Sequence, residues 1–569
     1  MTQAIRKTAP EPLAPVPFNI PQAFETTLDN GLKIILFEDK RLPLVSYRLA
    51  FLSGDIHDPA DSVGMTSAMA SMLTEGTLNY SSHELAEKIE RLGASLSANS
   101  SDDFTVVAGS ALSFYRTEVL QLIAEIVFRP TFPESELDLY RRNTIENLKF
   151  QRSQPGFLAS EQTAKLIYGN HPYSRVSPSA SDIEKLDREK LRAFHANALS
   201  PNNAILIAIG DLDREEFLKQ VHDEFGRWER RESEAPVFGN PPQRSSRTLT
   251  IVDRPGSAQS NIVLANAAID RRHPDYFAVL VMNQILGAGA SSRVFMNLRE
   301  EKGYTYGAYT RIDAKRLAGD FEATAEVRTG VTGESLKEFF YELNRIRTEK
   351  ATEDELADAK NFLTGVFPIR AETQEGLTSL IVNQQLYSLP DDYLQTYRDK
   401  VNAVTLDGVL EVANKYVQPD SIAIVIVGDA EEVLPQARDY SSEVTIYDTD
   451  GALMDPVKYE KNDNEATADA SGRWTVSLDF QGQSLPVTLV LEQSGETITG
   501  SLETMLGNGQ IDTGRVSGSK LKANTNMDIQ GQSVEFSIAG TIDGDTMSGE
   551  INAPALIPTP LTFAGAREG

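Results

Sequence analysis

Arg299 and Tyr306 are the two residues whose types and spacing point most directly to chemistry. They lie seven positions apart in the segment ILGAGASSRVFMNLREEKGYTYGAY, residues 285–309. A guanidinium group and a phenol hydroxyl both donate strong hydrogen bonds to an oxygen that carries negative charge. The plain alternative is that Arg299 pairs with a neighbouring carboxylate, Glu300 or Glu301, and that Tyr306 is a half-buried strand aromatic.

The residues around this pair predict the elements that hold it. A glycine-containing turn precedes Ser291, which can cap a helix over Val294–Arg299. Gly303 then ends the helix, and residues 304–309 have the pattern of a strand. Arg299 is therefore expected at the end of a helix, and Tyr306 on the strand that follows.

A second segment, GMTSAMASMLTEGT, residues 64–77, follows a helical pattern. It places Ser67 and Ser71 one helical turn apart, with Ala70 between them. No Gly-x-Ser-x-Gly pattern surrounds either serine and no histidine lies nearby in the sequence, which disfavours a serine hydrolase. The small side chains of this segment indicate close helix packing instead.

The numbers of histidines and cysteines limit the chemistry further. The chain has no cysteine, so disulfides, thiolate zinc sites and cysteine nucleophiles are excluded. It has six histidines, and the nearest two in sequence are His171 and His195. Two histidine ligands one helical turn apart therefore do not occur anywhere in the chain. Each lone histidine is predicted to be a surface or packing residue.

An internal duplication organises the chain that carries these segments. The stretches 183–211 and 401–429 align without gaps at an offset of 218 residues, as from Pro201 to Pro419. In both stretches an amphipathic helix ends before a proline, and an alternating apolar strand follows and stops at Gly-Asp. Longer helical patterns such as 116–128 and 332–349 precede each copy. The sequence therefore predicts two homologous α+β domains.

Composition changes mark the ends of these domains. A Pro- and Ser-rich stretch lies between the two copies, and an acidic stretch follows the second. After it, short alternating runs joined by Gly, Asn and Asp turns predict about eight strands of a small antiparallel barrel. The predicted layout is a Pro-rich tether (1–22), a first αβ domain (23–235), a linker (236–247), a second αβ domain (248–440), an acidic linker (441–471) and a β-rich domain (472–569).

The composition also excludes some functions. With 54 Lys and Arg against 82 Asp and Glu, the chain carries a formal charge of −28, which disfavours nucleic-acid binding. No apolar run is long enough to span a membrane. The prolines of the first 22 residues suit an extended tether behind a removed export signal, which favours a periplasmic location. A frayed start on a cytoplasmic protein is the alternative.

The two segments described first resemble the signatures of the insulinase/pitrilysin-type zinc peptidases, the inverzincins. In that family a glycine opens a helix bearing His-x-x-Glu-His, whose histidines bind zinc and whose glutamate is the general base. Laid on this frame, the histidine positions fall on Ser67 and Ser71 and the glutamate on Ala70. The family's third ligand falls on Asn147, with Glu146 one residue out of register. The resemblance therefore implies a degenerate metal site that binds no metal.

The second half keeps more of the family's pattern. LREEKGYTYG resembles the motif in which an Arg and a Tyr face the active site and bind substrate near the scissile bond, which implies that role for Arg299 and Tyr306. The stretch 91–107 resembles the family's edge strand, to which a substrate peptide adds as a further strand. An ordinary exposed edge strand is the alternative. The implied substrate-binding residues are Ala94, Ser95, Leu96, Ser97, Ala98 and Asn99.

Some members of this family divide their functions between two subunits, of which one binds zinc and the other supplies the Arg/Tyr pair. This chain resembles the second kind. We expect no cofactor in this chain, zinc in a homologous partner that carries His-x-x-Glu-His, and an extended peptide as substrate. The alternative is a non-catalytic peptide-binding or scaffold protein of the same fold. The C-terminal domain resembles the lipocalin-like β domains of some bacterial enzymes, as a packed accessory domain or a binder of a small ligand.

Overall fold

The computed structural model describes residues 20, 22–231, 237–459, 467–480, 483–504, 507–529, 532–552 and 560–568. The fold is mixed α+β, as predicted, and the described residues form two compact units. One unit contains the two αβ halves, and the other contains the C-terminal barrel. Most of the predicted N-terminal tether lies outside the described residues. Among the described helices, none has the length and apolar character needed to cross a membrane.

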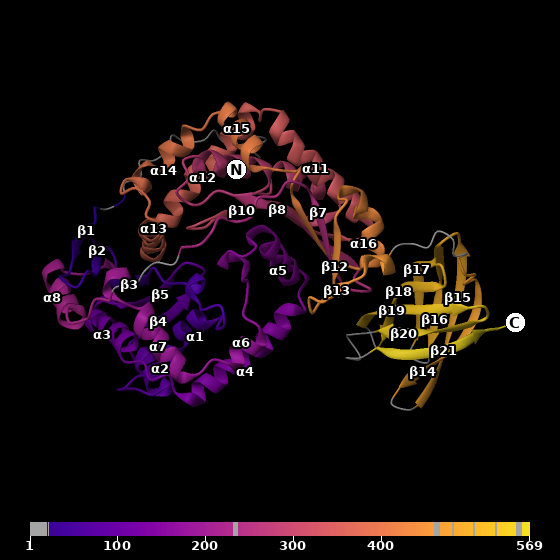
Figure 1. Ribbon diagram of the computed structural model, residues 1–569, viewed down its shortest axis with the longest axis horizontal. Helices are drawn as coiled ribbons and strands as arrows, with labels where there is room; N and C mark the ends of the chain where they lie inside the picture. Colours follow the sequence, from indigo (N-terminus) through magenta and orange to yellow (C-terminus); the bar gives the residue numbers. More distant parts are fainter. Residues whose placement is uncertain are drawn as a thin grey trace, which may run out of the picture. The chain divides into compact units, whose positions relative to one another are not determined.

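The first half, drawn in indigo to magenta in Figure 1, is built on a six-stranded sheet with the order β1-β2-β6-β3-β5-β4. Its strands are β1 (Phe24–Thr27), β2 (Lys33–Glu38), β3 (Leu44–Phe51), β4 (Ser95–Ser100), β5 (Thr105–Leu112) and β6 (Ala204–Gly210). Its helices are α1 (Met65–Met72), α2 (Ser82–Arg91), α3 (Arg116–Phe128), α4 (Glu134–Arg152), α5 (Pro155–Tyr168), α6 (Ala180–Glu184), α7 (Arg188–Ala198) and α8 (Arg214–Phe225). Strands β2 and β6 pair in parallel, and the other neighbouring strands pair antiparallel. Strand β4 lies at one edge of the sheet.

The second half is built on a seven-stranded sheet with the order β13-β12-β7-β11-β8-β10-β9. Its strands are β7 (Thr248–Asp253), β8 (Gln259–Ala268), β9 (Thr305–Ala314), β10 (Gly319–Arg328), β11 (Ala423–Gly428), β12 (Val444–Tyr447) and β13 (Leu453–Met454). The helices after β8 are α9 (Tyr276–Leu286), α10 (Arg293–Phe295), α11 (Thr332–Thr348), α12 (Glu353–Ala371), α13 (Gln374–Leu386), α14 (Tyr393–Asn402), α15 (Leu406–Tyr416) and α16 (Ala430–Ala437). Strands β12 and β13 fall inside the segment expected to be an acidic linker, so the sheet extends past the expected boundary at residue 440.

The duplication is visible in the elements themselves. A shift of 218 residues carries α7 onto α15 with the same bounds, and carries α4, α5 and β6 onto α12, α13 and β11 within a residue or two. The two halves also exchange one helix each, which means that one helix of each half packs on the sheet of the other half. Helix α5 packs on β8 and β11 of the second sheet, and α13 packs on β3 and β6 of the first. Each exchanged helix buries apolar side chains against the other half, which joins the halves through two hydrophobic cores.

The C-terminal unit is a closed antiparallel barrel of eight strands, as the turn spacing predicts. The strands are β14 (Gly472–Phe480), β15 (Gln483–Ser494), β16 (Thr497–Thr504), β17 (Gly507–Ser517), β18 (Lys520–Ile529), β19 (Gln532–Asp543), β20 (Thr546–Asn552) and β21 (Leu561–Arg567). Inward-facing apolar residues of these strands form one buried cluster around Trp474. The Trp474 indole Nε1 donates to the Ala470 carbonyl oxygen at 2.9 Å, so its one polar group is satisfied inside the barrel.

Candidate functional site

Helix α1 carries three of the four positions predicted to be a degenerate metal site, Ser67, Ala70 and Ser71. Gly64, with φ +91°, precedes the helix, and the buried Asp58 carboxylate holds the helix start. Its oxygens accept hydrogen bonds from Gly64 N at 2.7 Å, Thr66 N at 2.8 Å and Thr66 Oγ1 at 2.6 Å. Because these donors stabilise the negative charge, the carboxylate acts as a structural cap of the helix.

Ser67 is one member of a hydrogen-bonded cluster that joins α1 to β4. Its Oγ lies 3.2 Å from Asp55 Oδ1 and 2.8 Å from Ser100 Oγ. Ser100 Oγ in turn donates to Asp55 Oδ1 at 2.8 Å. The Asp55 backbone N–H donates to the Ser101 carbonyl oxygen at 2.9 Å, which fixes this loop to the end of β4. Burial raises the pKa of Asp55 to about 6, against the two serine hydrogen bonds that lower it.

A cavity of about 290 Å³ lies at these positions, between α1 and α4. Ser67 and Asn147 both line it, so the structure brings together two positions far apart in the sequence. Ala70 is fully buried and Ser71 is exposed outside the cavity lining. Glu146 points elsewhere: it is exposed and pairs with Lys149 at 2.7 Å.

The donor atoms at these positions do not suit a zinc ion. Hydroxyl, methyl and amide groups stand where imidazoles and carboxylates would bind it. No group of three or more His, Cys, Asp or Glu side chains that could hold a metal occurs in the part of the chain that the structure describes.

Arg299 and Tyr306 lie on either side of a turn at the edge of the second sheet. Arg299 is on a helix, as predicted, and the helix at this point is a π-helix, Met296–Glu301. Lys302 N donates to the Asn297 carbonyl oxygen five residues earlier, which is the π-helical pattern. The residue before the first helical turn is Ser292, one position after the predicted cap, Ser291. The Ser292 Oγ donates to the Gly289 carbonyl oxygen at 2.5 Å. Gly303, with φ +64°, follows the π-helix as predicted.

The Arg299 side chain is 45% exposed and has two modest contacts. Its Nε lies 3.4 Å from Glu300 Oε1, and its guanidinium lies 4.8 Å from the centre of the Phe295 ring. The pairing with Glu300 is therefore present, as the plain alternative expected. A half-exposed pair of this kind is worth well under about 1 kcal/mol, so it leaves the guanidinium available to another molecule.

Tyr306 is 91% exposed, which contradicts the alternative of a half-buried strand aromatic. The reason is a β-bulge: Tyr306 and Gly307 of β9 both stand opposite Glu326 of β10. Thr305 Oγ1 secures the bulge by donating to the Glu326 carbonyl oxygen at 2.6 Å and accepting from Gly307 N at 3.1 Å. A bulge redirects the side chains on its strand, and β9 is the edge strand of its sheet. The phenol hydroxyl therefore points away from the packed interior.

The predicted substrate-binding stretch Ala94–Asn99 matches strand β4, which is the edge strand of the first sheet. Side chains at alternate positions are exposed, namely Ser95, Ser97 and Asn99. The strand pairs with β5 on one side, for example Ala98 with Val107. The backbone groups on its other side have no strand partner among the described residues, which is the requirement for strand addition.

The two edge strands meet through the turns of their hairpins. Lys315, in the turn between β9 and β10, places its Nζ 2.6 Å from Asp102 Oδ2, in the turn between β4 and β5. Beside this ion pair, Tyr173 donates to Asp103 Oδ1 at 2.6 Å and accepts from Leu317 N at 3.3 Å. Neither this junction nor the cluster around Asp55 is evident from the sequence, because their members are separated by 12 to more than 200 residues.

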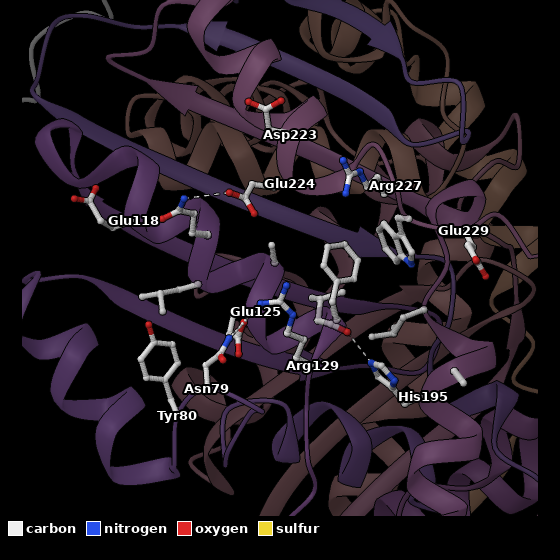
Figure 2. A pocket seen from close by; sticks show the side chains of 18 of the residues that line it. Asn79, Tyr80, Glu118, Glu125, Arg129, His195, Asp223, Glu224, Arg227 and Glu229 are labelled. Atoms are coloured by element: carbon white, nitrogen blue, oxygen red, sulfur yellow. Dashed lines mark hydrogen bonds and ion pairs between the residues drawn. The ribbon is translucent and has the colours of Figure 1, made fainter.

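Another cavity, of about 830 Å³, lies elsewhere in the first half (Figure 2). None of the predicted site residues lines it. His195 lies in its wall with Nε2 2.8 Å from the Val127 carbonyl oxygen, and burial lowers the pKa of the imidazole. Glu125 accepts hydrogen bonds from Asn79 at 3.1 Å and Arg129 at 2.9 Å. These groups hold α3 to its neighbours, in agreement with a packing role for His195.

Comparisons with known proteins match the two halves. Residues 33–176 match the family model described as insulinase (peptidase family M16), and residues 185–363 match the model described as peptidase M16 inactive domain. A non-peptidase homologue from Helicobacter pylori is 21% identical over 402 residues, 70% of this chain and 92% of its own. A probable mitochondrial-processing peptidase subunit beta from Schizosaccharomyces pombe is 23% identical, over 74% of this chain and 95% of its own. The crystal structure titled peptidase M16 inactive domain from Pseudomonas fluorescens has a TM-score of 0.67 at 28% identity, over 72% of this chain and 98% of its own.

Proposed function

Since this chain belongs to the insulinase (M16) family and carries serine, alanine and asparagine at the family's metal positions, we propose that it is the non-metal subunit of a two-chain peptidase. It supplies Arg299 and Tyr306 to a homologous zinc-bearing partner, and the pair of chains hydrolyses extended peptides. The single observation that carries the proposal is Tyr306: 91% of this side chain is exposed, on a bulged edge strand within the motif that resembles the family's Arg/Tyr segment.

The role of each residue follows from its chemistry. The Tyr306 hydroxyl can donate to the carbonyl oxygen of the scissile bond as negative charge develops there. The Arg299 guanidinium has several N–H groups and few internal contacts, so it can bind substrate carbonyl or carboxylate oxygens. Strand β4 offers backbone groups to an extended peptide, which gives binding that tolerates many sequences.

Water activation belongs to the partner in this proposal. The hydroxyl, methyl and amide groups of Ser67, Ala70 and Asn147 do not fit zinc, and no step of the reaction runs through a metal in this chain. The partner would carry His-x-x-Glu-His and hold the metal and the general base. Loss of one oxyanion donor costs about 3 kcal/mol of barrier, or 10²–10³ in kcat, which sets the size of the effect expected for Tyr306.

The test is peptide cleavage by a mixture of this chain with its zinc-bearing homologue. Tyr306→Phe should reduce kcat by at least 10², and Arg299→Ala should raise KM or reduce kcat/KM. Tyr309→Phe and Arg328→Ala are the matched controls, because both residues are exposed on the same hairpin and lie outside the motif pair. Full activity of the zinc homologue alone, or of mixtures with Tyr306→Phe, would refute the proposal.

A non-catalytic peptide-binding protein is the second candidate, favoured by the free edge of β4. It predicts that this chain binds extended peptides alone and leaves the rate of any zinc homologue unchanged. The same mixing experiment separates the two, because only the first candidate requires Tyr306 for turnover.

A further inference from the structure

We propose that the cavity at the degenerate metal positions binds the cationic side chain of a lysine or arginine in a peptide that adds to β4. The inference rests on the peptide binding proposed above and assigns a preference to it. The cavity has a volume of about 290 Å³, enough for the aliphatic stem and charged end of one such side chain. Its ligand would be part of the peptide chain and would take the place of a metal ion as the positive charge at this position.

Three carboxylates line the cavity, and two of them are already compensated. Asp58 accepts two backbone N–H groups at the start of α1. Asp102 pairs with Lys315 at 2.6 Å. Asp55 forms none of the ion pairs found among the described residues, and its carboxylate accepts hydrogen bonds from the hydroxyls of Ser67 and Ser100.

A half-buried carboxylate without a positive partner is a costly arrangement, and a cation placed beside it recovers much of that cost. The positive group in the lining, Arg175, lies on the Asp58 side, where its Nη1 is 3.3 Å from the Asp58 carbonyl oxygen. Burial raises the pKa of Asp58, and the Arg175 charge acts against that rise. The Asp55 end of the cavity is therefore the part that lacks positive charge.

The far wall suits a cation too. Helix α4 contributes Tyr140, Thr144, Asn147 and Gln151 to the lining, whose hydroxyl and amide oxygens can accept hydrogen bonds from an ammonium or guanidinium group. Apolar atoms of Ile56, Val63 and Leu148 also line the cavity and can contact the aliphatic stem.

The cavity is connected to the proposed peptide site. Ser100, the last residue of β4, donates to Asp55 Oδ1 at 2.8 Å. A peptide strand paired with β4 therefore ends its pairing beside the carboxylate. Since alternate residues of a strand point to the same side, one residue in the peptide can direct its side chain into the cavity while its neighbours face solvent.

The test compares two fluorescein-labelled decapeptides of uncharged residues with one central lysine, free in one and Nε-acetylated in the other. Binding to the full-length chain is measured by fluorescence anisotropy at pH 7.5. We expect the lysine peptide to bind at least tenfold more tightly than the acetylated one. Asp55→Asn should reduce this ratio to about one without changing the affinity for the acetylated peptide.

A second variant distinguishes the loss of the binding preference from a folding defect. Ser67→Lys places a tethered ammonium in the cavity, and it should raise the melting temperature while removing the preference for the lysine peptide. Equal binding of both peptides by the wild type overturns the cavity inference and leaves strand addition and the Arg/Tyr role standing. Binding of neither peptide overturns the inference as well, whereas the proposed catalytic role is decided separately by turnover with the zinc homologue.

Discussion

Asp55→Asn should change how the stability of the first unit depends on pH. The substitution keeps the shape of the side chain and an oxygen that can accept from Ser67 and Ser100, but it removes the titrating charge. In the wild type, burial raises the pKa of Asp55 from 3.8 to about 6. At about 1.4 kcal/mol per pKa unit, this shift corresponds to about 3 kcal/mol.

The sign follows from which state binds the proton more tightly. Because the pKa is raised in the folded chain, the folded state holds the proton between about pH 4 and pH 6 while the unfolded state releases it. The contribution of Asp55 to stability is therefore fully present below about pH 4 and is lost as the pH rises to about 6. The asparagine variant has no such loss, so its stability relative to the wild type should increase by up to about 3 kcal/mol across this window.

Thermal unfolding of both chains at pH 4, 5, 6 and 7.5 measures the effect. With an unfolding entropy of about 2 cal/mol/K per residue, about 3 kcal/mol in a unit of roughly 400 residues corresponds to about 3–4 °C. The other carboxylates are common to both chains, so the difference between their melting temperatures isolates Asp55. Asp61→Asn is the control, because it removes an exposed carboxylate from the same loop. A difference for Asp55→Asn that stays constant with pH would refute the reasoning.

Three further predictions test other parts of the structure. The family's ligands are restored by the combined substitutions Ser67→His, Ala70→Glu, Ser71→His and Asn147→Glu. The resulting chain should bind one zinc ion, measured by metal analysis after dialysis. Failure to bind zinc would show that the assigned register is wrong. Lys315→Met should speed amide hydrogen exchange in both hairpin turns because Asp102 loses its partner, and the exposed Lys337→Met should not. Trp474→Ala should destabilise the barrel by about 3–5 kcal/mol, seen as a lowered barrel transition in calorimetry with the transition of the first unit unchanged.

The parts of the fold that were predicted correctly are those with a local or repeated signal. The 218-residue offset placed α7 and α15 because both copies carry the same helical pattern before a proline. The exchange of α5 and α13 had no such signal, because an apolar helix face shows that the helix is buried but not against which sheet. Strands β12 and β13 were missed because they are short and lie in an acidic stretch, where pairing with β7 and not composition decides their structure.

The site shows the same difference between features with a local sequence signal and features that depend on tertiary contacts. The motif around Arg299 predicts the residues and the order of elements but neither the π-helix nor the bulge, and the bulge depends on how β9 pairs with β10. Ser67 and Asn147 were identified from the resemblance to a metal signature, and the structure places both in one cavity. Asp55 was not identified, because nothing in its own sequence neighbourhood distinguishes it from an ordinary loop aspartate. Its environment comes from β4 and α1, which folding brings to it.

The predicted metal positions and the pair Arg299 and Tyr306 differ in how far their hydrogen bonds are satisfied within the chain. This difference argues that Arg299 and Tyr306 act on another molecule. At the predicted metal positions the side chains form hydrogen bonds within the chain: Ser67 and Ser100 bond to Asp55, and Asp58 caps the helix. Tyr306 has no comparable internal partner in the described structure and buries about a tenth of its surface, so it adds little to stability. The bulge disturbs strand pairing and places the Tyr306 phenol in solvent, which neither packing nor the sheet explains. The hydrogen bonds that these two side chains can make are therefore available to another molecule.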